Sequence, residues 1–173
     1  MSSDTVGNTD RNLSTEPSYP SVDYLARMVS SGIFAGYFPV ARGTFSSLLV
    51  IILYFLLSDY LNFNRIWIFL PFLYFLGVWS ASRCEVFWGK DNGRIVIDEI
   101  VGMLVTVVFL PLNFKIACIG FFLFRAFDIF KPPPIRRLES LPRGWGVMTD
   151  DLVAGIYANL VLRFIIHIFP WVT

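Results

Sequence analysis

The chain has 173 residues, of which 55% are hydrophobic and 17% aromatic, and its mean hydropathy is +0.63. This composition is too apolar for a soluble fold of that length, so we expect a bilayer to cover much of the surface. The fourteen basic and thirteen acidic residues leave a formal net charge of only +1. Without a large basic excess, nucleic acid is not expected as a partner.

Residues 1–23 are predicted to form a disordered polar tail, because they are rich in Ser, Thr, Asn, Asp and Pro and contain no apolar run. They do not have the pattern of a signal peptide. Residues 24–173 are predicted to form one membrane-embedded domain. Its first segment, Tyr24–Phe38, is interrupted by Gly and Pro, so we expect it to lie at the membrane interface or to re-enter the membrane.

Five apolar stretches follow, and they predict an all-α, polytopic helical membrane bundle of four or five short spans. The stretches are Phe45–Leu61, Ile66–Ala81, Ile100–Leu112, Ile116–Phe130 and Leu152–Trp171. Several are shorter than the ~20 residues that cross the hydrocarbon fully. The third and fourth stretches are expected to form a tight hairpin around Pro111 and Asn113.

The basic residues predict the orientation, because Lys and Arg near the ends of spans are retained in the cytoplasm. If the N-terminus is cytoplasmic, ten of the fourteen basic residues lie on that side, and only Arg65 and Lys115 lie in the outer turns. Arg125 and Arg163 fall inside apolar stretches, where a charge usually faces a polar interior, a partner or the interface.

The same orientation brings five acidic residues to the cytoplasmic surface, at the start of the third stretch, the end of the fourth and the start of the fifth. These residues are Asp98, Glu99, Asp128, Asp150 and Asp151. Helix N-capping would explain one acid of each adjacent pair, but it explains neither the second acid nor Asp128. Together with two nearby cations the five acids leave an excess of three negative charges, which a divalent cation would relieve. Oxygen ligands without His or Cys favour Mg²⁺ or Mn²⁺.

Arg125, Asp128 and Lys131 recur every third residue, so they project from nearly one face of a helix that three prolines then end. Arginine can grip phosphate with its planar fork, and lysine supplies a point charge. The structural alternative is an Arg125–Asp128 ion pair, with Lys131 reaching out to the lipid headgroups.

Two glycine-containing segments could bring backbone N–H groups close to an anion, although a turn with a helix cap is the commoner meaning. They are Gly43–Ser47 and Gly144–Gly146. The single histidine, His167, is expected in the outer half of the last stretch, far from the acids. A phosphatase that uses two histidines is therefore excluded, and neither cysteine lies in a loop suited to a reactive thiolate.

Four motifs occur in order along the chain: GTFSS at Gly43–Ser47, DEIVGM at Asp98–Met103, FRAFDIFKPPPI at Phe124–Ile135 and GWGVMTDDLVAG at Gly144–Gly155. In this combination the chain resembles the phosphatidylglycerophosphatase A family, from about Gly32 to Phe164. Ser46 and Arg143 stand where the family usually has Gly, and Arg42 stands where it usually has Pro. These departures weaken a phosphate cradle made of backbone alone, and Arg143 would instead add a direct phosphate contact.

The resemblance implies a multi-pass enzyme of the bacterial inner membrane, with its active site facing the cytoplasm. Its reaction would be the Mg²⁺-dependent hydrolysis of phosphatidylglycerophosphate to phosphatidylglycerol and phosphate, a step of phospholipid biosynthesis. The predicted metal ligands are Asp98, Glu99, Asp150 and Asp151. The predicted catalytic residues are Arg125, Asp128, Lys131 and Asp151, and the predicted phosphate-binding residues are Thr44, Arg125, Lys131, Arg143, Gly144 and Gly146. Attack by water and an aspartyl-phosphate intermediate both stay open, as do the number of metal ions and the oligomeric state.

Two alternatives come from other functional classes. A small cation-coupled transporter would also carry clustered intramembrane acids, but here the acids lie at one surface and the sequence has no paired repeats. A noncatalytic membrane scaffold predicts that acid-to-amide substitutions change folding, with no turnover to lose.

Overall fold

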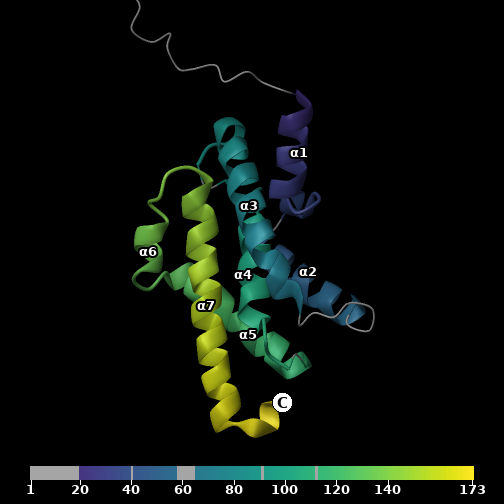
Figure 1. The fold of residues 1–173 in the computed structure, drawn as a ribbon, viewed down its shortest axis with the longest axis vertical. Helices are drawn as coiled ribbons and strands as arrows, with labels where there is room; N and C mark the ends of the chain where they lie inside the picture. The colour runs from purple at the N-terminus through teal and green to yellow at the C-terminus, as the bar shows by residue number, and fades with distance from the viewer. Residues whose placement is uncertain (1–19, 40, 58–64, 91, 112) are drawn as a thin grey trace, which may run out of the picture.

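The computed structural model describes residues 20–39, 41–57, 65–90, 92–111 and 113–173, and every regular element in these ranges is helical. The α-helices are α1 (Pro20–Ser30), α2 (Arg42–Leu57), α3 (Ile66–Trp88), α4 (Ile97–Val107), α5 (Phe114–Phe130), α6 (Ile135–Leu138) and α7 (Gly144–Ile168) (Figure 1). Two short 3-10 helices, η1 (Ala35–Tyr37) and η3 (Pro170–Val172), precede α2 and follow α7. The predicted all-α fold is confirmed.

Each predicted span corresponds to one helix, but several boundaries differ. α3 continues for seven residues beyond Ala81, and α7 begins at Gly144, eight residues before the predicted start at Leu152. These extra turns contain polar residues or glycine, so hydropathy alone does not mark them, yet they pack against neighbouring helices. The predicted ends at Leu61 and Leu112 lie outside the described residues.

At the N-terminal end α1 overlaps the last residues of the predicted tail. It begins at Pro20, a residue suited to the first turn of a helix, so residues 20–23 are helical. Asp23 Oδ1 accepts a hydrogen bond of 2.9 Å from Arg83 Nη2, which ties α1 to the end of α3. Residues 1–19 lie outside the described part of the chain, and the depth of Tyr24–Phe38 in a membrane stays a prediction.

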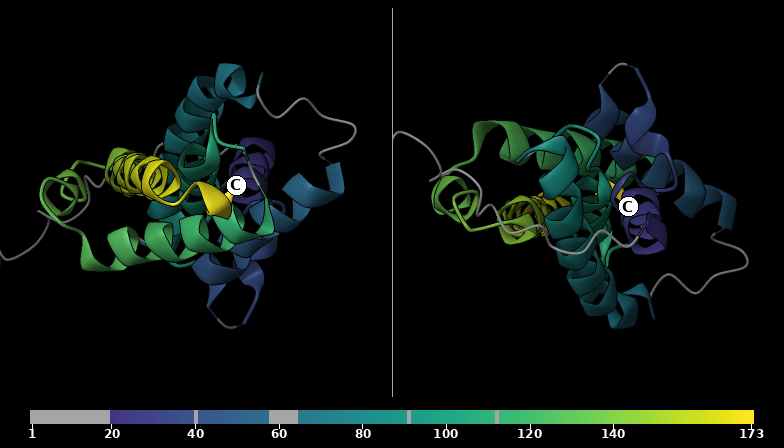
Figure 2. Two further views of the ribbon diagram at one scale, coloured as in Figure 1. Left: turned by 90° about the horizontal axis from the view of Figure 1, so that it is seen from below. Right: turned by 90° about the horizontal axis from the view of Figure 1, so that it is seen from above.

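α4 lies near the centre of the bundle, with α2, α3, α5 and α7 around it (Figure 2). Its side chains are the most thoroughly enclosed part of the apolar core: Val101 and Met103 have no exposed surface. A helix that is buried on all sides has apolar residues all round, so its sequence is a continuous apolar run and was predicted to be a membrane span.

α4 and α7 approach each other backbone to backbone at Gly102 and Gly155. A Cβ on Gly155 would overlap the carbonyl of Gly102, and a Cβ on Gly102 would lie 2.8 Å from the carbonyl oxygen of Asp151. Small residues permit such close crossings between helices in membranes. Because Asp98 and Asp151 each precede one of these glycines by one turn, the crossing brings the two carboxylates to the same level.

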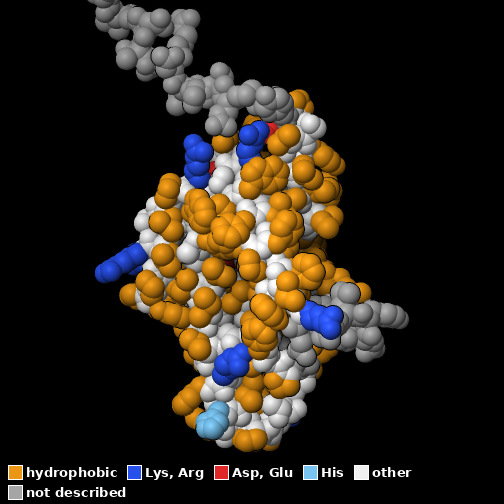
Figure 3. Space-filling model, in the orientation of Figure 1, with side chains coloured by type: hydrophobic (Ala, Val, Ile, Leu, Met, Phe, Trp, Pro, Cys, Tyr) orange, Lys and Arg blue, Asp and Glu red, His pale blue; other side chains and the backbone are white. Residues whose placement is uncertain are grey.

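Two helices, α3 with 23 residues and α7 with 25, are long and apolar enough to cross a membrane, while α2 is a shorter apolar helix. Hydrophobic side chains cover most of the face drawn in Figure 3. α4 has only 11 residues and extends for about 17 Å, well short of the ~30 Å of hydrocarbon.

The short α4 ends inside the bundle, where its last carbonyl groups need donors. Asn159 on α7 supplies them: its Nδ2 lies 3.2, 2.8 and 3.0 Å from the carbonyl oxygens of Val105, Thr106 and Val108. Arg163 in turn donates from Nε to Asn159 Oδ1 at 2.7 Å. Arg163 therefore serves a polar contact within the protein, as expected of a charge in an apolar stretch.

The predicted third span ends earlier than expected, because α4 stops at Val107, and α5 then begins at Phe114 and packs against α4. Asn113 is the N-cap of α5, and its side chain accepts a hydrogen bond of 2.9 Å from the backbone N–H of Ile116. Its Nδ2 also donates to the carbonyl oxygens of Val172 and Thr173, which holds the end of the chain against the start of α5.

The glycine crossing makes a stability prediction. We expect Gly155→Ala to lower the free energy of unfolding by about 1–3 kcal/mol, because the added methyl group forces α7 away from the backbone of Gly102. Gly93→Ala is the matched control, since a Cβ there would meet only Arg42 Nη1 at 3.4 Å. Thermal unfolding midpoints of the two variants in detergent check the prediction, and equal midpoints would contradict it.

Candidate active site

The five acidic residues converge from three helices, as the orientation predicted. Asp98 and Glu99 lie in the first turn of α4, Asp128 near the end of α5, and Asp150 and Asp151 in the first half of α7. Asp151 lies close enough to the other four carboxylates to interact electrostatically with each of them.

The capping interpretation of the acidic pairs is wrong. α7 begins at Gly144 with Arg143 as its N-cap residue, so Asp150 and Asp151 lie nearly two turns inside the helix rather than at its start. The N-cap residue of α4 is Val96, and it forms no side-chain cap. Asp98 and Glu99 do stand in the first turn of α4, where the positive end of the helix dipole favours negative charge.

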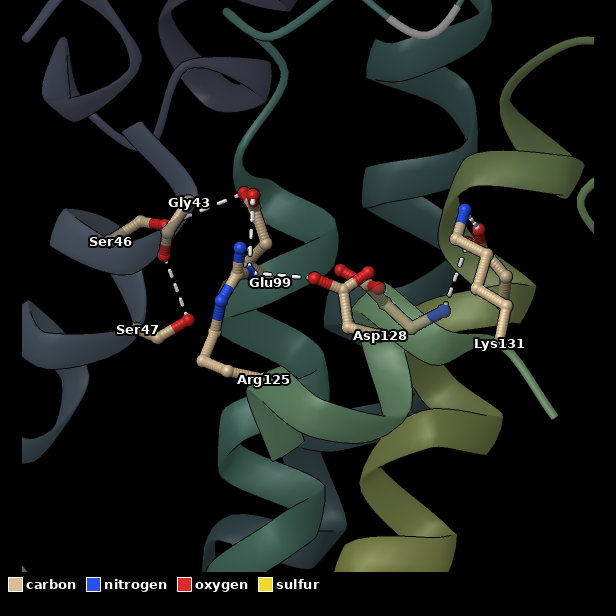
Figure 4. A network of polar contacts seen from close by, with 9 residues as sticks. Gly43, Ser46, Ser47, Glu99, Arg125, Asp128 and Lys131 are labelled. Atoms are coloured by element: carbon tan, nitrogen blue, oxygen red, sulfur yellow. Dashed lines mark hydrogen bonds and ion pairs between the residues drawn. The ribbon is translucent and has the colours of Figure 1, made fainter. Parts of the chain in front are cut away.

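Arg125 connects two of the acids. Its Nη1 lies 2.8 Å from Asp128 Oδ2 and 3.9 Å from Glu99 Oε1, so one guanidinium group links α5 to α4 (Figure 4). The Arg125–Asp128 ion pair of the structural alternative is therefore present. These three side chains are only 16–20% exposed, which limits the solvent screening of their charges.

Lys131 lies on the other side of the cluster and points inward. Its Nζ donates to Asp150 Oδ2 at 2.8 Å and lies 3.0 Å from Glu139 Oε1. The alternative in which Lys131 extends to the headgroups is therefore wrong. Burial by itself would lower the pKa of Lys131, but hydrogen bonds and the charges of Asp150 and Glu139 raise it above its ordinary value, so the amine carries a positive charge.

The first turn of α2 packs against the acid cluster beside Glu99. Ser46 Oγ donates to the carbonyl oxygen of Gly43 at 2.9 Å and lies 3.4 Å from Glu99 Oε2 (Figure 4). A Cβ on Gly43 would overlap the Glu99 carboxylate and lie 3.1 Å from Arg125 Nη1, so a side chain there would displace the Glu99 carboxylate. Thr44, the next residue, is half-buried in the same turn, and its phosphate contact stays a prediction.

The glycines at the start of α7 serve packing instead of the predicted phosphate cradle. The N–H of Gly144 donates to Ser82 Oγ at 3.1 Å, and the N–H of Gly146 donates to the carbonyl oxygen of Arg143. Their Cα atoms face the backbone of α3 and of residues 139–141, with no room for a Cβ. Phosphate binding by Gly144 and Gly146 thus finds no support in the geometry.

Arg143 itself is exposed and lies seven residues before Asp150, about 10 Å along the helix axis. It belongs to none of the ion pairs of the cluster. Its contact with phosphate stays a prediction.

The donor chemistry of the cluster suits Mg²⁺. Asp98 and Asp151 are 7% and 4% exposed and form no ion pair with a described residue, and the buried Asp98 Oδ1 has no hydrogen-bond partner among these residues. Unpaired buried carboxylates are costly unless they bind a cation. In the described residues no three His, Cys, Asp or Glu side chains are already arranged around one metal position, so binding requires them to turn toward a common point.

Sequence reasoning missed Glu139 and the contact of Ser46 with Glu99. Glu139 follows α6, eight residues after Lys131, and only the turn through the three prolines brings it back to that amine. No spacing rule for helices predicts such a return. His167 and Cys118, which were predicted to lie outside the site, belong to none of its contacts.

Comparison with known proteins gives a consistent result. The family model described as phosphatidylglycerophosphatase A matches residues 28–166. A phosphatidylglycerophosphatase A of Haemophilus influenzae is 36% identical over 78% of this chain and 85% of the relative, and one of Escherichia coli is 33% identical over 83% and 84%. A protein of Bacteroides thetaiotaomicron with the name "Putative phosphatidylinositol-3-phosphatase" is 34% identical over 80% and 92%. No solved structure matches the chain significantly.

Proposed function

Since this chain belongs to the phosphatidylglycerophosphatase A family, we propose that it converts phosphatidylglycerophosphate to phosphatidylglycerol and phosphate in phospholipid biosynthesis, with Mg²⁺ as cofactor. Family membership makes the chain a phosphomonoester hydrolase, in preference to the transporter or scaffold alternatives. The observation that carries the proposal is the convergence of five carboxylates with Arg125 and Lys131 at one end of the bundle.

Asp98, Glu99, Asp150 and Asp151 are the proposed Mg²⁺ ligands. Their all-oxygen chemistry and the unpartnered oxygen of Asp98 support this choice. When bound, the cation supplies positive charge that stabilises the charge developing on the phosphoryl oxygens. Lys131 already neutralises part of Asp150, so Asp98 and Asp151 hold the negative charge that most needs a cation.

Arg125 and Lys131 are proposed to bind the nonbridging oxygens of the phosphate. Both are cations with limited exposure, and they approach the acids from two sides of the cluster (Figure 4). Hydrolysis of a phosphomonoester is very slow without catalysis, so charge stabilisation and positioning must supply most of the acceleration.

Asp128 is proposed to orient a water molecule and accept its proton, while Arg125 fixes the carboxylate through their 2.8 Å contact. The water oxygen bonds to phosphorus, the ester P–O bond breaks, and the proton that Asp128 accepted balances the one that the leaving glycerol oxygen takes up from solvent. In the alternative route an aspartate oxygen bonds to phosphorus as the ester P–O bond breaks and the glycerol oxygen takes up a proton, and water then hydrolyses the acyl phosphate to free phosphate and the carboxylate.

We place this enzyme in the bacterial inner membrane, with the acid cluster on the cytoplasmic side. Two long apolar helices support a membrane location, and the basic residue Arg42 stands next to Gly43, which approaches the Glu99 carboxylate. Lys115 lies at the other end, where its Nζ donates to the carbonyl oxygen of Trp171.

The orientation can be tested by thiol labelling. Cysteines introduced at Asn92 and Glu139 in a Cys118→Ala background should react with an impermeant reagent only from the cytoplasmic side, because positive charge retains that end inside. Cys84 is fully buried and should not react with the reagent. A cysteine at Lys115 is the control for the opposite end. Periplasmic labelling at Asn92 or Glu139 would overturn the orientation.

The metal requirement makes a second prediction. Exhaustive chelation should abolish phosphate release from phosphatidylglycerophosphate, and added Mg²⁺ should restore it, because the unpaired acids cannot by themselves stabilise an incoming phosphate. Phosphate release in detergent with EDTA, followed by titration with MgCl₂, measures this. Full turnover in the chelated enzyme would refute the role of the metal.

The acids themselves make the third prediction. Asp128→Asn and Asp151→Asn should each reduce turnover by about a hundredfold or more, about 3 kcal/mol in the barrier, because an amide neither binds Mg²⁺ well nor accepts a proton. If Asp128 serves only its ion pair with Arg125, its amide variant should lose stability but keep its rate.

Turnover per folded molecule, with the thermal midpoint measured beside it, separates these outcomes. His167→Ala and Cys118→Ala are the controls and should keep nearly full activity, since neither residue contacts the cluster. Wild-type turnover in both amide variants would show that these acids are not catalytic.

A further inference from the structure

Lys131 has two carboxylate partners that differ in how firmly they are held. Asp150 comes from the interior of α7, its side chain is 7% exposed, and its Oδ1 also accepts the backbone N–H of Asp151. Glu139 follows the four-residue α6, and its side chain is 36% exposed. Asp150 is therefore the fixed partner of the amine, and Glu139 is the partner that water can replace.

The partly exposed pair can break at little cost. Ion pairs near solvent contribute little to stability, because water screens the charges and ordering the side chains costs entropy. Rotation of Glu139 away from Lys131 returns its carboxylate to water. The same rotation of Asp150 would leave a charge buried beside the other acids.

A phosphate that binds to the Lys131 amine lies close to the negatively charged carboxylate of Glu139, which contacts the same amine. Two carboxylates already contact Nζ, at 2.8 and 3.0 Å, and take up two of the three N–H donors of the ammonium group, so a phosphoryl oxygen that binds there competes with both for its positive charge. Repulsion between the phosphate and a nearby carboxylate favours the same exchange. Because Glu139 is the more exposed partner, it is the one that leaves.

We propose that Glu139 is an exchangeable latch on Lys131, whose carboxylate occupies the place of a substrate phosphoryl oxygen and withdraws when the phosphate binds. This inference rests on the proposed function, in which Lys131 binds the phosphate. Before the substrate binds, Glu139 holds the Lys131 amine in place beside the cluster. When the substrate arrives, Glu139 competes with its phosphate for that amine. It therefore sets the affinity for phosphate groups and does not take part in the bond-breaking step.

The test compares wild-type protein with Glu139→Gln in detergent micelles with MgCl₂. Loss of the competing charge should lower KM for phosphatidylglycerophosphate, and the inhibition constant of inorganic phosphate, by about threefold or more. The value of kcat should stay within about twofold, since binding changes equally in the ground and transition states. An unchanged or higher KM, or a loss of kcat alone, would overturn the latch.

Two further variants separate the ion pair from its alternatives. Asp23→Asn removes a carboxylate that is paired with Arg83 of α3 and belongs to no ion pair of the acid cluster, so KM should not change. Glu139→Asp keeps the charge but shortens the side chain by one methylene, so KM should fall here as well if contact with Lys131 is what competes. A wild-type KM in Glu139→Asp would point to general charge repulsion and overturn the latch.

Calorimetric titration with inorganic phosphate applies the same comparison without turnover. Tighter phosphate binding by Glu139→Gln than by wild type supports the latch, and equal binding overturns it. Should Glu139→Gln not fold, Glu139→Ala removes the same carboxylate and takes its place. Absence of phosphate release by the wild-type enzyme would instead refute the proposed function, so the two failures remain distinguishable.

Discussion

The contact between Gly102 and Gly155 is the constraint on which the site depends. It lets the backbones of α4 and α7 touch, and each glycine follows an acidic residue by one turn. A side chain at either position would separate the helices and with them Asp98 and Asp151. The close packing of the two glycines, one helical turn further into the bundle, therefore determines how close the two carboxylates lie.

Gathering carboxylates in this way opposes folding, because each is partly removed from water and repels the others. Arg125 and Lys131 offset part of the repulsion, one from each side, and both come from the end of α5. Two acids of low exposure, Asp98 and Asp151, are left without a cationic partner among the described residues. A stable arrangement that leaves this charge unbalanced is suited to binding a cation and a phosphate together.

The short α4 poses a second problem, since its end lies within the bundle and exposes carbonyl groups there. Asn159 and Arg163 satisfy them from α7, so the helix that carries Asp151 also fixes the depth of the helix that carries Asp98. Glycines near one end and a polar cap near the other hold α4 against α7 over its whole length. The acids of the cluster then need little support from loops.

The sequence by itself indicated the five apolar helices, the gathering of the acids from three of them, the shared helix face of Arg125 and Asp128, and the family, because periodicity, charge distribution and motifs are properties of neighbouring residues. Only the tertiary structure showed that Asp150 and Asp151 lie inside α7, that Gly144 and Gly146 pack against other segments, and that Glu139 returns to Lys131. These facts depend on contacts between residues far apart in the chain or across a turn of irregular backbone. Hydropathy and spacing carry no information about such contacts, because any of several packings would satisfy the same local pattern.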